Sequence, residues 1–213
     1  MDWNTGLVIT GGHAPRGPLS FSDADCLVVA ADSGLDVAHR HGITPHAIVG
    51  DMDSLENSAL LNSFPNADVQ VWDRAKDYTD TEIALKYLWD RSVEDITLVG
   101  GGGGRLDHLL AISALFERDR TPRRWVTDRE EVLVVEESVE FTGDRGDVVS
   151  FLPVGPNVAR MRSEGLRWNL DGLAWHRGDV GISNECTGGR CRVDMLSGRL
   201  LMVRELPPVV QLP

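Results

Sequence analysis

The chain has 213 residues, a formal net charge of -12 and three cysteines. This length suffices for one large domain or two smaller ones, each with its own core. The negative charge argues against nucleic acid or an anionic membrane as partner, since both are themselves negative, and it is compatible with a cationic substrate or divalent metal ions. No signal peptide, membrane span or disulfide framework is evident, so we expect a cytoplasmic protein.

Short apolar segments alternate with helical patterns in the first part of the chain. Strands are predicted at 7–10, 27–31, 47–49, 69–72, 96–99 and 124–126, and helices at 35–41, 56–62, 79–89 and 106–118. Such alternation is typical of an open, mostly parallel sheet with helices on both faces. We therefore predict an α/β domain over residues 1–130, with the boundary lying within 127–137.

The pattern changes over residues 131–213. Short apolar segments separated by Gly, Asp, Asn and Pro predict strands at 132–135, 148–152, 158–161, 166–170, 180–183, 191–196 and 200–203. This pattern indicates an antiparallel, all-β sandwich or partial barrel. Gly188-Gly189 also suggests a two-residue hairpin turn, which would place the free thiols of Cys186 and Cys191 opposite each other.

Two aspartates, Asp51 and Asp53, follow the predicted strand 47–49 after a glycine. Carboxylates so placed beyond a strand can share Mg²⁺ with phosphate or water oxygens. Taken alone, the motif is more often an Asx turn followed by a helix N-cap.

Three other predicted strands end in similar polar loops. Asp32-Ser33-Gly34 follows strand 27–31, the segment 76–80 with Asp77 and Asp80 follows strand 69–72, and residues 100–108 follow strand 96–99. Ligands of open α/β sheets bind beyond the carboxyl ends of the strands, so we expect these loops to share one site. Simpler interpretations are open for each: a turn at Asp32, a helix cap at Asp77 or Thr79, and a flexible linker at the glycines 100–104.

The loop 100–108 begins with five glycines and continues as Arg105-Leu106-Asp107-His108. Glycine N–H groups at a helix N-terminus can cradle phosphate, and Arg105 supplies a guanidinium for phosphate oxygens. His108 is either a donor to phosphate or a satisfied core residue. Together the loops point to phosphoryl or pyrophosphoryl transfer. The usual P-loop, protein-kinase and dinucleotide motifs are absent from the sequence.

The combined motifs resemble those of the thiamine pyrophosphokinase family. The resemblance rests on segments 50–54, 76–85 and 103–108, with shorter likeness at 165–170 and 183–184. It implies an α/β domain that binds ATP and Mg²⁺, a C-terminal β-sandwich that binds thiamine, and a homodimer. The implied reaction transfers the pyrophosphoryl group of ATP to the hydroxyl of thiamine and yields thiamine diphosphate and AMP.

The resemblance also implies roles for individual residues. Asp51, Asp53 and Asp77 would hold Mg²⁺ and the ATP phosphates, and Asp80 would complete the catalytic set. The implied nucleotide-binding residues are Asp32, Gly103, Gly104, Arg105, Asp107 and His108. The implied thiamine-binding residues are Trp168, Ser183 and Asn184.

Two positions depart from the family pattern. Ser33 stands where the family usually has Gly, and Ile112 stands where bacterial members often have Asn, which removes a polar group. Two alternative functions stay open from the sequence. One is the same transfer to another alcohol, such as a hydroxymethylpterin, and the other is a non-catalytic protein that binds nucleotide or thiamine.

Overall fold

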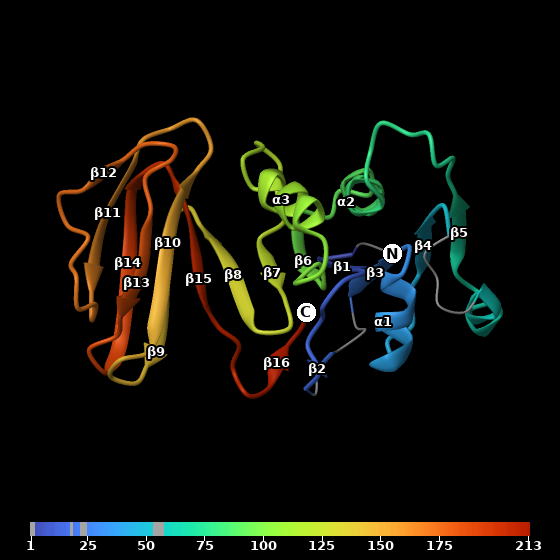
Figure 1. The fold of residues 1–213 in the computed structure, drawn as a ribbon, viewed down its shortest axis with the longest axis horizontal. Helices are drawn as coiled ribbons and strands as arrows, with labels where there is room; N and C mark the ends of the chain where they lie inside the picture. The colour runs from blue at the N-terminus through green and yellow to red at the C-terminus, as the bar shows by residue number, and fades with distance from the viewer. Residues whose placement is uncertain (1–2, 18, 22–24, 53–57) are drawn as a thin grey trace. The chain divides into compact units, whose positions relative to one another are not determined.

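The structure, a computed structural model, describes residues 3–17, 19–21, 25–52 and 58–213. The chain divides into two compact units (Figure 1). The α/β unit comprises residues 1–112, 122–129 and 206–213, and the β unit comprises residues 113–121 and 130–205.

The α/β unit contains a parallel sheet. Its strands are β1 (Thr5–Thr10), β3 (Cys26–Ala31), β4 (Ala47–Gly50), β5 (Asp68–Val71), β6 (Asp95–Val99) and β7 (Arg124–Val126). They lie in the order β7-β6-β1-β3-β4-β5, and every neighbouring pair is parallel. The predicted α/β fold is confirmed, and each of the six predicted strands is present: β1 begins two residues earlier than predicted, and the other five lie within one residue of their expected bounds.

Helices cover both faces of this sheet. The α-helices are α1 (Gly34–Arg40), α2 (Asp80–Trp89) and α3 (Leu106–Leu115). Figure 1 shows α1 on one side of the strands and α2 on the other. In α2, the buried residues Ala84 and Leu85 lie four and three residues before the buried Leu88, so they share one face of the helix, which packs on the sheet. The predicted helix at 56–62 lies partly outside the described residues, and η1 (Ser58–Ser63) is a 3₁₀ helix.

The start of α2 settles which residue caps it. Thr79 is the N-cap: its hydroxyl oxygen accepts a hydrogen bond from the amide of Glu82, and the Glu82 carboxylate accepts one from the amide of Thr79. This reciprocal capping box satisfies two N–H groups that the helix itself leaves unpaired. The cap is therefore Thr79 and not Asp77.

The β unit is an antiparallel sandwich, as predicted. One sheet has the order β13-β10-β15-β8 and the other β12-β11-β14-β9. The strands are β8 (Glu130–Val135), β9 (Ser138–Gly143), β10 (Val148–Val154), β11 (Ala159–Glu164), β12 (Ala174–Trp175), β13 (Gly181–Glu185), β14 (Gly189–Ser197) and β15 (Arg199–Glu205). Apolar side chains of both sheets form one core, which includes Phe141, Met161 and Phe151.

Two predictions for the β unit are wrong. Residues 166–170 form a loop with one isolated bridge, Leu166 to Cys186, rather than a strand. The turn at Gly188-Gly189 joins β13 and β14, which belong to different sheets, so it is not a hairpin. Cys186 and Cys191 nevertheless meet as free, buried thiols, and burial is the main cause that raises the pKa of Cys186 to about 12.

The unit boundaries differ from the predicted division into 1–130 and 131–213. Residues 113–121 belong to the β unit, where Arg199 donates hydrogen bonds to the backbone oxygens of Phe116 and Arg118 at 2.9 and 2.8 Å. Residues 206–213 return to the α/β unit, where β16 (Val210–Gln211) pairs in parallel with β2 (Leu19–Ser20). No helix in the described part of the chain is long and apolar enough to cross a membrane.

Candidate functional site

The loops that follow the central strands lie at one edge of the parallel sheet. β1 is central, the chain builds outward through β3, β4 and β5, and then returns to the other side of β1 with β6. This reversal is the topological switch point at which open α/β sheets bind ligands. The carboxyl ends of β3, β4 and β6 lead into the polar loops singled out in the sequence.

Three carboxylates converge at this edge. Asp32 follows β3, Asp51 follows β4 and Asp80 begins α2. One carboxylate oxygen from each lies within 4.8 Å of the others, and all three residues are partly buried. We refer to Asp32, Asp51 and Asp80 as the carboxylate group. Three such carboxylates repel one another unless cations are close.

Gly50 makes this convergence possible. Its φ of +142° is a conformation that side-chain-bearing residues rarely adopt. A β-carbon placed on Gly50 would lie 3.1 Å from both Cβ of Asp32 and Oδ1 of Asp80. Only a residue without a side chain therefore fits between two members of the carboxylate group.

Basic side chains balance part of the negative charge. The ammonium of Lys76 forms an ion pair with Oδ1 of Asp80 at 2.9 Å, but the geometry is not that of a hydrogen bond. The Lys76 side chain is only 12% exposed. Nε of Arg74 lies 3.9 Å from Oδ2 of Asp51, but this side chain is 77% exposed and screened by water. Sequence reasoning assigned no role to Lys76, although it stands four residues before Asp80.

The carboxylate group fits Mg²⁺. The ion prefers oxygen ligands at about 2.0–2.1 Å, so two oxygens on one ion lie about 3–4.2 Å apart. The three carboxylate oxygens lie within 4.8 Å of one another, close to the upper end of that range. Among the predicted metal ligands, Asp51 belongs to the group, the exposed Asp77 does not, and Asp53 lies outside the described residues.

The glycine loop, residues 100–104, follows β6, and its first three amides donate hydrogen bonds to backbone carbonyls of the same unit. Gly100 donates to Val126, Gly101 to Gly11 and Gly102 to His13, at 2.9, 2.6 and 3.0 Å. In the described chain, the amides of Gly103 and Gly104 donate to no backbone carbonyl, and both residues are exposed.

The loop after β1 was missed by sequence reasoning, and it packs directly on the glycine loop. A β-carbon on Gly103 would lie 2.2 Å from Nδ1 of His13, and the ring of His13 is 3.6 Å from Asp128. Gly11-Gly12 directly after a strand is the sequence signal that would have revealed this loop.

Arg105 and Asp107 pair with each other at the start of α3. Arg105 Nη2 and Nε donate to the two carboxylate oxygens of Asp107 at 2.6 and 3.1 Å, and both side chains are exposed. The hydrogen bond from Arg105 is the main cause that lowers the pKa of Asp107. His108 is exposed as well, so it is not a core residue, and its amide donates to Asp107 at 3.0 Å.

Ile112 and Ser33, the two residues that depart from the family pattern, lie in different surroundings. Ile112 is 5% exposed, and a β-carbon on Gly101 would lie 2.2 Å from its Cδ1. The isoleucine therefore supports the glycine loop by packing against Gly101. Ser33 precedes α1 as its N-cap residue, without a side-chain capping hydrogen bond.

The predicted thiamine-binding residues lie together in the β unit. Trp168 is 51% exposed, and the side-chain amide of Asn184 is hydrogen-bonded to its backbone. Ser183 is exposed, has a φ of +59° and donates from its amide to Ser150 Oγ at 3.0 Å.

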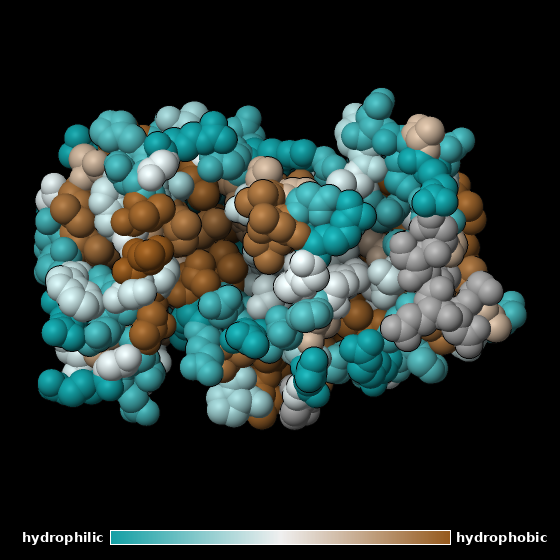
Figure 2. All heavy atoms as spheres, in the orientation of Figure 1, coloured by the Kyte–Doolittle hydropathy of each residue, from teal (hydrophilic) through white to brown (hydrophobic). Residues whose placement is uncertain are grey.

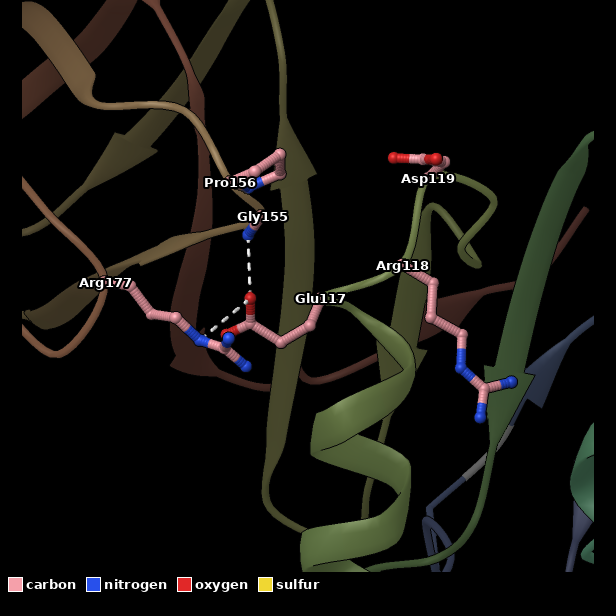
Figure 3. Close-up of a pocket in the computed structure, with 6 residues that line it drawn as sticks. All are labelled: Glu117, Arg118, Asp119, Gly155, Pro156 and Arg177. Carbon is pink, nitrogen blue, oxygen red and sulfur yellow. Dashed lines mark hydrogen bonds and ion pairs between the residues drawn. The ribbon is translucent and has the colours of Figure 1, made fainter.

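Two cavities lie away from the carboxylate group. One of about 410 Å³ in the β unit is lined by Glu117, Arg118, Asp119, Gly155, Pro156 and Arg177. In it, Glu117 accepts a hydrogen bond from the Gly155 amide at 2.9 Å and pairs with Arg177 at 3.6 Å, whereas Arg118 points away from them (Figure 3). The other, of about 550 Å³, includes His46 at the amino end of β4, opposite to the end that leads to Asp51.

Both units match one family of known proteins. Residues 20–125 match the family described as "Thiamin pyrophosphokinase, catalytic domain", and residues 133–200 match "Thiamin pyrophosphokinase, vitamin B1 binding domain". The chain belongs to the thiamine pyrophosphokinase family. It is therefore an enzyme that pyrophosphorylates thiamine, and the resemblance inferred from the motifs is confirmed.

Individual thiamine pyrophosphokinases are similar over nearly the whole chain. The enzyme of Bacillus subtilis (strain 168) is 25% identical over 208 residues, which cover 92% of this chain and 96% of that protein. A crystal structure of the Bacillus subtilis enzyme has a TM-score of 0.76 at 24% identity and covers 96% of this chain and 100% of the other. The Geobacillus thermodenitrificans structure has a TM-score of 0.72 at 29% identity and covers 95% and 98%.

Proposed function

We propose that the chain transfers the pyrophosphoryl group of ATP to the hydroxyl of thiamine, requires Mg²⁺ and releases AMP. The observation that supports this most directly is the carboxylate group at the switch point of the parallel sheet. In the proposed reaction, the thiamine oxygen bonds to the β-phosphorus of ATP, and the bond from that phosphorus to the oxygen bridging to the α-phosphorus breaks. The hydroxyl proton passes to solvent or a base, and AMP leaves.

The chain's own residues bind and orient the reactants. Asp32, Asp51 and Asp80 would hold Mg²⁺, which neutralises phosphate charge when bound. The ammonium of Lys76, 2.9 Å from Oδ1 of Asp80, offsets part of the negative charge of these carboxylates. The roles of Asp53 and Asp77 at the metal and the phosphates stay predictions.

The start of α3 supplies the phosphate contacts. The amides of Gly103 and Gly104 are directed to no backbone acceptor in the described chain, and Arg105 is exposed beside them. We assign these three residues to ATP oxygens, with Asp107 orienting Arg105 through their ion pair and His108 as a further donor. The net charge of -12 favours a cationic acceptor such as thiamine. Three free, buried cysteines are in keeping with a cytoplasmic location.

The donor and the leaving group can be tested directly. With ATP, Mg²⁺ and thiamine, we expect AMP and thiamine diphosphate to form in equal amounts, and neither to form when Mg²⁺ is chelated. Chromatography of the nucleotides together with fluorescence detection of oxidised thiamine products measures both. Formation of ADP and thiamine monophosphate would contradict pyrophosphoryl transfer. AMP formation only with a hydroxymethylpterin would instead support the alternative acceptor.

We further propose a homodimer that shares its active sites. Large apolar side chains are exposed in both units: Leu106 and Leu110 on α3, and Val148, Val180 and Ile182 in the β unit. Figure 2 shows apolar patches over α3 and over the strands of the β unit. Association with a second copy would cover such surfaces, and a two-fold dimer would create two equivalent sites.

Subunit mixing tests whether sites are shared. Asp51→Asn and Trp168→Ala chains, each defective alone, are mixed under conditions that exchange subunits. If each site combines residues of two chains, a hybrid dimer has one site with both lesions and one intact site, so we expect activity to return to about half of the wild-type value per hybrid. If mixing restores no activity although mass spectrometry shows that hybrids form, the shared-site proposal is wrong.

A further inference from the structure

The side chain of Asn184 is committed to the backbone that carries Trp168. Its Oδ1 accepts hydrogen bonds from the amides of Trp168 and Glu185 at 3.1 and 2.8 Å, and its Nδ2 donates to the carbonyl of Trp168 at 2.7 Å. An amide oxygen has two lone pairs, so both acceptor positions are used. With Asn184 only 5% exposed, at most one N–H is left for any other partner.

The loop 165–170 is fixed at both of its ends as well. The carbonyl of Gly165 accepts hydrogen bonds from the amide and hydroxyl of Thr187 at 2.9 and 3.1 Å and from the Cys191 thiol at 3.2 Å. The amide of Leu170 donates to Ser163 Oγ at 2.9 Å. Between these ends, both polar backbone groups of Trp168 bond to the one side chain of Asn184.

One face of the Trp168 ring is covered. The guanidinium carbon of Arg167 lies 4.6 Å from the centre of the indole, and Arg167 Nη1 donates to the Glu185 carboxylate at 2.7 Å. The amide of Arg167 also donates to the carbonyl of Glu185 at 2.8 Å. Because Trp168 is still 51% exposed, a planar ligand can approach it only from the side that Arg167 leaves open.

We propose that Asn184 is a positioning residue that acts on thiamine through Trp168 rather than by touching it. Asn184 holds the peptide of Trp168, and Arg167 with Glu185 covers one side of the ring, so the open face is presented to an aromatic ring of thiamine. This inference rests on the proposed assignment of Trp168 to the thiamine site. It changes the role of Asn184, which the family resemblance implied to be among the thiamine-binding residues.

A double-mutant cycle separates the two roles. We expect Asn184→Ala to weaken thiamine binding by about tenfold, because the buried hydrogen bonds that hold the backbone of Trp168 are lost. The loss should appear as a rise in KM and in the calorimetric Kd, with little change in kcat. Trp168→Ala should weaken binding at least as much. The double variant should then bind thiamine no more weakly than Trp168→Ala alone.

Other results of this cycle would contradict either the positioning role of Asn184 or the assignment of Trp168. If the losses from Asn184→Ala and Trp168→Ala multiply in the double variant, Asn184 acts independently of Trp168 and the inference is wrong, while the thiamine site stands. If Trp168→Ala leaves thiamine binding unchanged, the assignment of Trp168 itself fails. Circular dichroism and the melting temperature check folding. If Asn184→Ala does not fold, Asn184→Asp, which keeps the acceptor oxygen, enters the same cycle with the same criteria.

Discussion

Replacing Asp51 by Asn is expected to lower kcat by on the order of 10²–10³-fold or more. Asp51 supplies a carboxylate oxygen to a group whose members lie within 4.8 Å, and its side chain is only 16% exposed. An amide keeps the shape but removes a full negative charge from a site proposed to hold Mg²⁺ and ATP phosphates, where fixed charges have large effects on the transition state. Steady-state production of AMP measures the loss.

Thermal stability gives a second readout for the same change. Mg²⁺ with ATP should raise the melting temperature of the wild-type chain by mass action, and Asp51→Asn should abolish this rise. Asp95→Asn is a matched control, because Asp95 is exposed at the start of β6, at the opposite edge of the sheet. Normal turnover in Asp51→Asn, or an equal loss in Asp95→Asn, would contradict the assigned metal site.

Replacing Arg204 by Met is expected to destabilise the fold by about 3–5 kcal/mol, because it removes the cation beside a buried carboxylate. Glu131 is 1% exposed, and Arg204 Nε donates to its Oε1 at 2.7 Å. Without the guanidinium, the charge of Glu131 would stay buried with less compensation. Urea unfolding followed by circular dichroism measures the free energy of unfolding.

Two further variants test this explanation. Arg190→Met removes the cation from an ion pair with Glu140 in which both side chains are more than half exposed, and should cost far less. Combining Arg204→Met with Glu131→Met should restore much of the lost stability, because no buried charge is left. A double variant less stable than Arg204→Met would show that the loss arises from packing instead of charge.

The sequence predicted the α/β unit well because its central strands are mostly continuous apolar runs. Residues 26–31, for example, are buried on both faces, and turn residues bound the run. The same pattern placed Asp32 and Asp51 at the ends of adjacent strands. Which carboxylates meet depends on side-chain directions and on the backbone at Gly50, so sequence spacing did not distinguish Asp80 from Asp77.

The β unit was predicted less completely. Strand β9 was missed because Val139 and Phe141 are its only large apolar residues, and the glycines at 188–189 gave a turn signal without revealing that the chain changes sheets there. Gly11-Gly12 signals a loop after β1, but the packing of His13 against Gly103 and the pairing of Lys76 with Asp80 depend on the folded backbone.

The path of the chain limits how this enzyme can be recombined. The polypeptide passes between the two units at 112/113, 121/122, 129/130 and 205/206. A fragment ending at residue 130 would lose Val210 and Leu212 from the α/β core, and would keep Phe116 without the Arg199 that binds its carbonyl. Exchange of one unit between relatives by a single crossover in the gene would therefore leave parts of both units mismatched, so replacing a whole unit requires several crossovers.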